Sequence, residues 1–202
     1  MPVRIPYAHV ISGVPDIVLA FAFLATWIDP FALGENMVPY LFQVMLLEFI
    51  IIHSSGFMSG IMFSGTEKKK KIMMLSGLGG FYMLFAGGFA LGFKSWWPVI
   101  TFGGLLLNRM LSVLLGQSPE GEEKMFAMKM WGANVVFYLL SVFAVIILPL
   151  PVLGVSSDHL SHLDMSGEFV DQPHLMMAWG FLYFLAAGLF ELSQGTTVQP
   201  EQ

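Results

Sequence analysis

The sequence predicts an all-α fold, a polytopic bundle of transmembrane helices. Of its 202 residues, 56% are hydrophobic and only 11% are charged, and the mean hydropathy is +0.73. Six apolar runs each approach or exceed the roughly 20 residues that a helix needs to cross a hydrocarbon core. Because backbone groups in lipid must be paired within the protein, and barrel strands of about 10 residues do not fit these runs, we expect helices.

The six predicted spans are joined by segments with recognisable end signals. The first span runs into Trp27-Ile28-Asp29-Pro30 without a small-residue cleavage site, so we expect it to stay in the mature protein. Trp96-Trp97-Pro98 predicts a tight turn at a membrane interface, and Ser118-Pro119-Glu120 is typical of a helix start. The predicted spans cover residues 8–28, 37–63, 72–93, 97–115, 128–150 and 175–192, and a loop at 151–174 joins the last two.

The lengths of the polar segments predict one membrane domain over residues 1–202. The longest stretch outside the apolar runs is the loop 151–174, which is too short to bury a core of its own. A functional site therefore has to lie among the helices or be built from that loop.

A run of four lysines between the second and third spans sets the predicted orientation. Such clusters mark the cytoplasmic side, and an even number of spans then places both termini there. We expect a multi-pass protein of a bacterial-type inner membrane. The same residues, Lys68, Lys69, Lys70 and Lys71, are candidates to bind anionic lipid headgroups.

The composition also excludes several function classes. The chain has no cysteine, which excludes disulfides, thiol redox chemistry and cysteine-ligated iron–sulfur clusters. The net charge of −5 and the lack of distributed basic patches argue against a nucleic-acid partner. Serine-hydrolase, zinc-protease and P-loop motifs are missing, so an enzyme is the less favoured reading.

Two ionisable residues, Glu48 and His53, stand inside the second span. A charged group at that depth costs several kcal/mol on rough insertion scales unless it faces protein or water, so such residues point to functional sites. Their spacing puts them about 140° apart around a helix, on different faces. Glu48 aligns with Ser55, and His53 aligns with a glycine face at Gly56 and Gly60.

Arg109 on the fourth span is the natural partner of Glu48, because its guanidinium stays charged and can bind a carboxylate through two hydrogen bonds. Several alternatives stay open: a structural ion pair, a transport or proton-relay role, or recognition of a ligand. Arg109 could also extend to the headgroups, and Asp16 could be a first-turn acid of its helix. The predicted polar network comprises Asp16, Glu48, His53, Ser55, Asn108 and Arg109.

Glycines at helical spacing on the second and third spans predict close helix packing. The packing partner could be another helix of this chain, a second copy in a homo-oligomer, or a partner membrane subunit. A flat lipophilic ligand is a further alternative. The residues are Gly56, Gly60, Gly77, Gly80, Gly88 and Gly92.

The loop at 151–174 holds histidines and acids in a spacing that suits a divalent metal. Two histidines three residues apart can share a metal ion with carboxylate oxygens. The alternative is that the acids only solvate the loop. The candidate ligands are Asp158, His159, His162, Asp164 and His174.

Three functions follow from these features. The leading prediction is the movement of a small solute, ion or proton through the intramembrane polar site. The second is a non-catalytic accessory or structural subunit of a membrane complex. The third is a metal-dependent membrane enzyme that uses the loop at 151–174.

Overall fold

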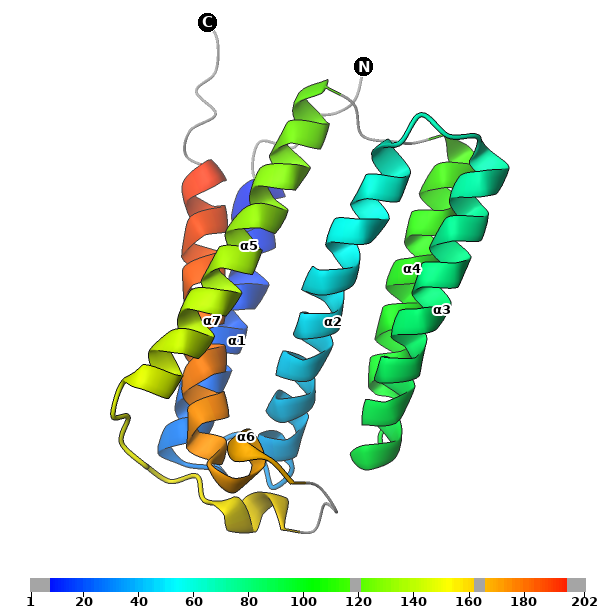
Figure 1. Ribbon diagram of the computed structural model, residues 1–202. Helices are drawn as coiled ribbons and strands as arrows, with labels where there is room; N and C mark the ends of the chain where they lie inside the picture. Colours follow the sequence, from blue (N-terminus) through cyan, green and yellow to red (C-terminus); the bar gives the residue numbers. More distant parts are fainter. Residues whose placement is uncertain (1–7, 117–120, 162–165, 196–202) are drawn as a thin grey trace, which may run out of the picture. The chain divides into compact units, whose positions relative to one another are not determined.

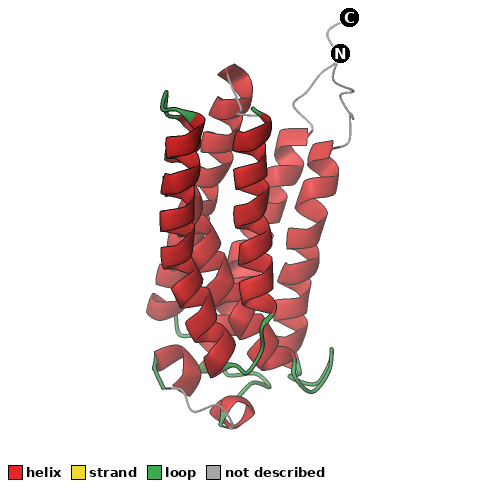
Figure 2. Cartoon of the chain, turned by 90° about the vertical axis from the view of Figure 1, so that its right-hand side faces the viewer, coloured by secondary structure: helices red, strands yellow, loops and turns green. Residues whose placement is uncertain are grey.

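A computed structural model describes residues 8–116, 121–161 and 166–195, and these residues form helices and loops with no strand (Figure 2). The all-α prediction is confirmed. In chain order (Figure 1) the helices are α1 (Ala8–Ile28), α2 (Met37–Phe63), α3 (Lys68–Gly92), α4 (Trp97–Leu115), α5 (Gly121–Ile147), the short 3-10 helix η1 (Ser157–Leu160), α6 (Glu168–Asp171) and α7 (Pro173–Gly195).

The long helices are those of a multi-pass membrane protein. Five of them, α2, α3, α4, α5 and α7, are long and apolar enough to cross a membrane. In α1 the described segment Gly13–Ile28 is apolar but shorter than the five helices that meet this test. The count of six spans, the cytoplasmic termini and the inner-membrane location stay predictions.

Helix boundaries differ from the predicted spans mainly at the polar ends. The four lysines form the first turn of α3, which begins at Lys68. Helix α5 begins at Gly121, where φ is +54°, and the helix start predicted at 118–120 lies outside the described residues. The loop at 151–174 contains η1 and α6.

The chain divides into two compact units. Unit 1 comprises residues 1–41, 133–162 and 166–202, and unit 2 comprises residues 42–132 with 163–165. Unit 1 therefore holds α1, α7, η1, α6 and the second part of α5. Unit 2 holds α3, α4, most of α2 and the first part of α5.

Unit 1 is organised around α1 and α7, which lie side by side (Figure 1). Gly180 on α7 contacts the ring of Phe23 on α1, which is fully buried and stacks on Phe184 with 5.6 Å between ring centroids. A Cβ added at Gly13 would lie 2.9 Å from the carbonyl oxygen of Gly188. Glycine is therefore what lets the two helices approach this closely.

Unit 2 is organised around residues that α2, α3 and α4 contribute to one apolar cluster. Leu47, Leu75 and Phe102 are buried members, one from each helix. Helix α3 ends in a Schellman motif, in which Ser95 N–H donates to the Ala90 carbonyl at 2.9 Å. The αL position of that motif is occupied by Lys94, with φ +53°. A four-residue connection follows from this tight ending, and α4 begins where the turn at Trp96-Trp97-Pro98 was predicted.

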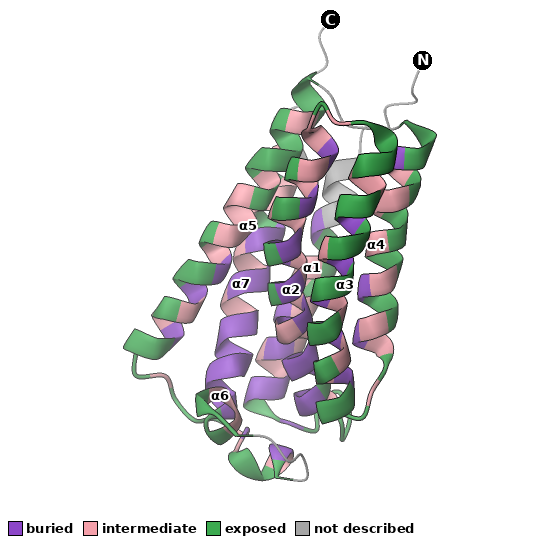
Figure 3. Cartoon of the chain, turned by 45° about the vertical axis from the view of Figure 1, so that its right-hand side comes forward, coloured by how far each residue is buried: buried purple, intermediate pink, exposed green. Residues whose placement is uncertain are grey.

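Burial is uneven among the long helices (Figure 3). In the most apolar stretch of each helix, 56% of the residues of α7 are buried, against 22% in α3 and 17% in α4. Most of the apolar surface of α3 and α4 is therefore open to lipid or to another protein.

Candidate intramembrane site

The guanidinium of Arg109 is the charged centre of the candidate site in unit 2. It lies on α4, is half-buried, and its Nη2 donates to Ser55 Oγ on α2 at 2.9 Å. Its Nη1 lies 3.8 Å from the sulfur of Met62. Both of these partners are uncharged, so neither contact neutralises the charge of Arg109.

A small cavity borders this contact. Its volume is about 40 Å³, and its polar lining comes from Ser54, Ser55 and Arg109. The Oγ of Ser54 is buried and donates to the Ile51 carbonyl of its own helix at 3.3 Å. Since one water occupies roughly 30 Å³ in the liquid, the space suits a water molecule or a small inorganic ion. Its remaining walls are apolar: Ile51, Met58, Phe102, Leu105 and Leu106.

His53 belongs to a different group of side chains. Its Nδ1 lies 2.9 Å from the hydroxyl of Tyr82 on α3, and the imidazole is exposed whereas Tyr82 is buried. The ring also stacks on Phe49 with centroids 5.6 Å apart and meets Phe57 edge-on at 5.4 Å. His53 is therefore held in an aromatic cluster and is not among the residues that line the cavity.

The other predicted members of the network lie in separate surroundings. Glu48 is half-buried on α2, seven residues before Ser55. Asn108 is exposed on α4, and its backbone carbonyl accepts from Ser112 Oγ at 3.0 Å. Asp16 belongs to unit 1, where its Cβ lies 3.1 Å from the position of a Cβ built on Gly188.

The structure thus joins Ser55 to Arg109 directly and joins His53 to a residue that the sequence reasoning missed. The six-residue network and the ion pair between Glu48 and Arg109 stay predictions. The sequence could have predicted a polar partner for Tyr82, because a buried tyrosine hydroxyl inside an apolar span needs a hydrogen-bond partner. His53 offered one at similar depth on the neighbouring span.

The glycines of α2 and α3 fall into those that pack closely against a neighbouring side chain and those that do not. A Cβ at Gly56 would lie 2.5 Å from the ring of Trp131, whose Nε1 donates to the Ile52 carbonyl at 2.9 Å. On α3 the close contact is made at Gly79, against Leu106 of α4. Gly92 is exposed. A Cβ would meet no atom within 4 Å at Gly60, Gly77, Gly80 and Gly88.

Two of the four lysines bind the ends of neighbouring helices. Lys71 Nζ donates to the Met62 carbonyl in the last turn of α2 at 2.7 Å, and Lys68 Nζ donates to the Leu114 carbonyl at the end of α4 at 2.9 Å. Both contacts satisfy terminal carbonyls and place positive charge at the negative end of a helix dipole. Lys69 and Lys70 are exposed, and headgroup binding by this run stays a prediction.

The predicted metal ligands are only partly within the described residues. His159 in η1 has its Nδ1 3.2 Å from the backbone N–H of Ser156, Asp158 is exposed and His174 is buried on α7. His162 and Asp164 lie outside the described residues. Within the described ranges, no group of three or more histidines and acids is placed to hold a metal ion.

No protein-family model, curated protein sequence or solved structure matches this chain. The site places the guanidinium of Arg109 beside the hydroxyls of Ser54 and Ser55, with apolar side chains around them. Such a site is suited to hold an anion, because hydrogen bonds to charged groups strengthen where water is largely excluded.

Proposed function

We propose that the protein moves a small inorganic anion across the membrane through the site at Arg109 and Ser55. The observation that supports this is the half-buried guanidinium on a membrane-spanning helix, hydrogen-bonded to the neutral Ser55 hydroxyl beside a cavity of about 40 Å³. An unneutralised charge inside a span is costly. Because arginine does not lose its proton in proteins, a bound anion would offset that charge.

Glu48 is proposed to act as the proton-binding group of the same path. It lies two helical turns from Ser55 on the same face of α2. An ionised carboxylate there would repel an anion, whereas the neutral acid would let it pass. Protonation of Glu48 would then couple anion movement to a proton.

The test is anion flux into vesicles that contain the purified full-length protein. We expect wild-type protein to conduct chloride or nitrate, and Arg109→Gln to reduce the rate at least about tenfold, the loss expected for a binding contribution of roughly 1.4 kcal/mol. Ser55→Ala should reduce flux less. Unchanged flux in a folded Arg109→Gln protein, or wild-type flux equal to that of empty vesicles, would refute the proposal.

Ser112→Ala is the matched control for Ser55→Ala. The hydroxyl of Ser112 donates to the Asn108 carbonyl of its own helix at 3.0 Å, whereas the hydroxyl of Ser55 accepts from Arg109. We expect its flux to equal that of the wild type. Circular dichroism and thermal unfolding of each variant separate lost transport from lost folding.

A second candidate function is that of an accessory subunit, which the open glycine face of α3 favours. At Gly77, Gly80 and Gly88 a Cβ would meet nothing within 4 Å, and small residues of this kind are where helices of membrane complexes approach closely. Co-purification of another membrane protein in mild detergent, lost on Gly80→Leu, would support this role. Recovery of the chain alone, without a partner, would contradict it.

A further inference from the structure

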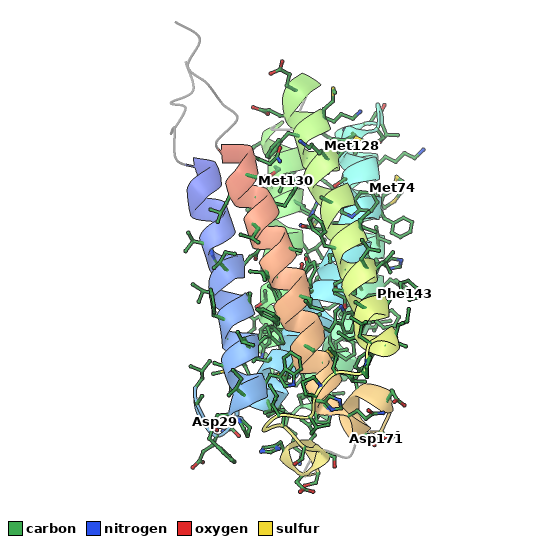
Figure 4. The ribbon with its side chains drawn as sticks, turned by 90° about the vertical axis from the view of Figure 1, so that its left-hand side faces the viewer. Asp29, Met74, Met128, Met130, Phe143 and Asp171 are labelled. Carbon is green, nitrogen blue, oxygen red and sulfur yellow. The ribbon has the colours of Figure 1, made fainter. Side chains whose placement is uncertain are left out.

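A larger cavity lies in unit 1, between the end of α5 and the beginning of α7. Its volume is about 400 Å³, within the range of small-molecule sites. Much of its wall is apolar, with Val145 and Leu148 from the α5 side and Phe169 from α6. Helix α6, which carries Asp171, lies beside the first turns of α7 (Figure 4). Phe169 is fixed there by stacking on Trp179 with centroids 5.2 Å apart.

His174 gives this cavity a polar group that lacks a protein partner. The residue is only 7% exposed, it lines the cavity, and no hydrogen bond joins its ring to another residue in the described ranges. Neither ring nitrogen is among the fully buried side-chain atoms of the described residues that lack a hydrogen-bond partner, so the imidazole is accessible from the cavity. A ligand in the cavity can therefore form a hydrogen bond with it.

Two other polar side chains on the wall, Glu168 and Gln172, carry hydrogen-bond acceptors. The Nε2 of Gln172 donates to one carboxylate oxygen of Glu168. That contact uses the donor side of the amide, so the Gln172 carbonyl and the second Glu168 oxygen are left as acceptors. Glu168, Gln172 and a neutral His174 together offer three acceptors to one ligand head.

The charges of unit 1 favour a cation. The chain has no lysine or arginine after Lys129, and Arg4 is the one basic residue before residue 42. Acidic side chains in the same unit include Asp158, Glu168 and Asp171. A positively charged ligand would therefore be attracted, and an anion repelled.

We propose that this cavity binds a small organic ammonium ion with an apolar body. The three N–H donors of a primary ammonium match the acceptors of Glu168, Gln172 and His174. An aryl or alkyl body of moderate size fits beside Phe169 and Leu148. This site lies wholly within unit 1, so the proposal is independent of anion movement in unit 2.

The test is calorimetric titration of the purified full-length protein in detergent micelles with three probes of similar size: phenethylammonium, 2-phenylethanol and phenylacetate. We expect phenethylammonium to bind with a Kd below about 1 mM, and the neutral and anionic probes to bind at least about tenfold more weakly. Equal affinity for all three, or no binding of the ammonium ion, would overturn the proposal.

Glu168→Gln and Asp171→Asn form a matched pair of variants. Both residues are exposed acids of α6, and only Glu168 lines the cavity. We expect Glu168→Gln to weaken phenethylammonium binding about tenfold and Asp171→Asn to weaken it less than twofold. Equal weakening by the two would show diffuse charge attraction and would refute the site.

His174→Gln tests the buried partner, with thermal unfolding as the check on folding. A folded variant with unchanged affinity would remove His174 from the site and overturn the proposed set of acceptors. Arg109→Gln should leave ammonium binding intact whether or not it abolishes anion flux. Loss of anion flux with intact ammonium binding would concern the Arg109 site alone, and loss of ammonium binding with intact flux would concern the cavity of unit 1 alone.

Discussion

The helix pair α1–α7 in unit 1 and the helix pair α3–α4 in unit 2 use glycine in opposite ways. In α7, 56% of the most apolar stretch is buried, and Gly180 and Gly188 lie directly against α1. In α3 the buried share is 22%, and most of its glycines face open space. A glycine stripe therefore indicates a smooth helix face, but the stripe does not indicate what covers that face.

The two pairs differ in what holds them together. Helices α1 and α7 are in close contact at two levels: Gly13 lies against Gly188, and the ring carbons of Phe23 fill the space at Gly180. The α3–α4 pair shares a buried apolar cluster with α2, has the Leu106 side chain against Gly79, and is also held at one end by Lys68, which binds the last turn of α4. Glycine-to-alanine substitutions should therefore destabilise the first pair more than the second, and substitutions at the helix ends should act on the second.

The largest expected effect is that of Gly180→Ala. The added methyl would overlap the ring of Phe23, which is fully buried and stacked on Phe184, so neither ring has room to move. We expect the free energy of unfolding to fall by about 1–3 kcal/mol. Denaturant unfolding in detergent micelles, followed by circular dichroism, measures it.

Gly79→Ala is the control for that prediction in the other pair. Its methyl would also overlap a neighbour, but the contacted atoms are the far end of the half-buried Leu106 side chain, which can change rotamer. We expect a loss below about 1 kcal/mol. Equal losses at Gly79 and Gly180 would contradict the contrast between the pairs.

The lysine contacts predict the next largest effect. Lys68→Gln with Lys71→Gln removes two charges and two hydrogen bonds to helix ends, so we expect a loss of roughly 1–2 kcal/mol in the free energy of unfolding. Lys69→Gln with Lys70→Gln removes the same charge without removing either of these two helix-end hydrogen bonds, and should change stability by less than about 0.5 kcal/mol. If the two double variants unfold alike, the helix-end contacts do not stabilise unit 2.

Lys94→Gly should stabilise the turn between α3 and α4. Lys94 holds φ +53°, a conformation in which a Cβ costs roughly 1–2 kcal/mol and glycine costs little. We expect a gain of about 1 kcal/mol in unfolding free energy. Lys94→Ala removes the charge but keeps the Cβ, so a similar gain for Ala would show that charge, and not backbone conformation, is responsible.

Hydropathy and length were sufficient to predict the helices, because the requirement to pair every backbone group in lipid leaves little alternative to α-helix. The hydrogen-bond partners of individual side chains were harder to predict from the sequence. Arg109 bonds Ser55 and His53 bonds Tyr82, and both pairings depend on which helix faces neighbour each other. Residue spacing within one helix fixes a face but contains no information about the facing helix, which is also why Gly79 was missed.

The smallest effect on the isolated protein is expected for Gly80→Ala, where a Cβ would meet nothing within 4 Å. Alanine favours helix over glycine by up to about 1 kcal/mol, so the purified protein should be slightly more stable or unchanged. If another chain packs on this face in the native membrane, the same methyl would weaken that complex while the isolated protein stays stable. Unfolding of the purified variant, compared with its migration in mild detergent extracts, separates an open face from one that a partner covers.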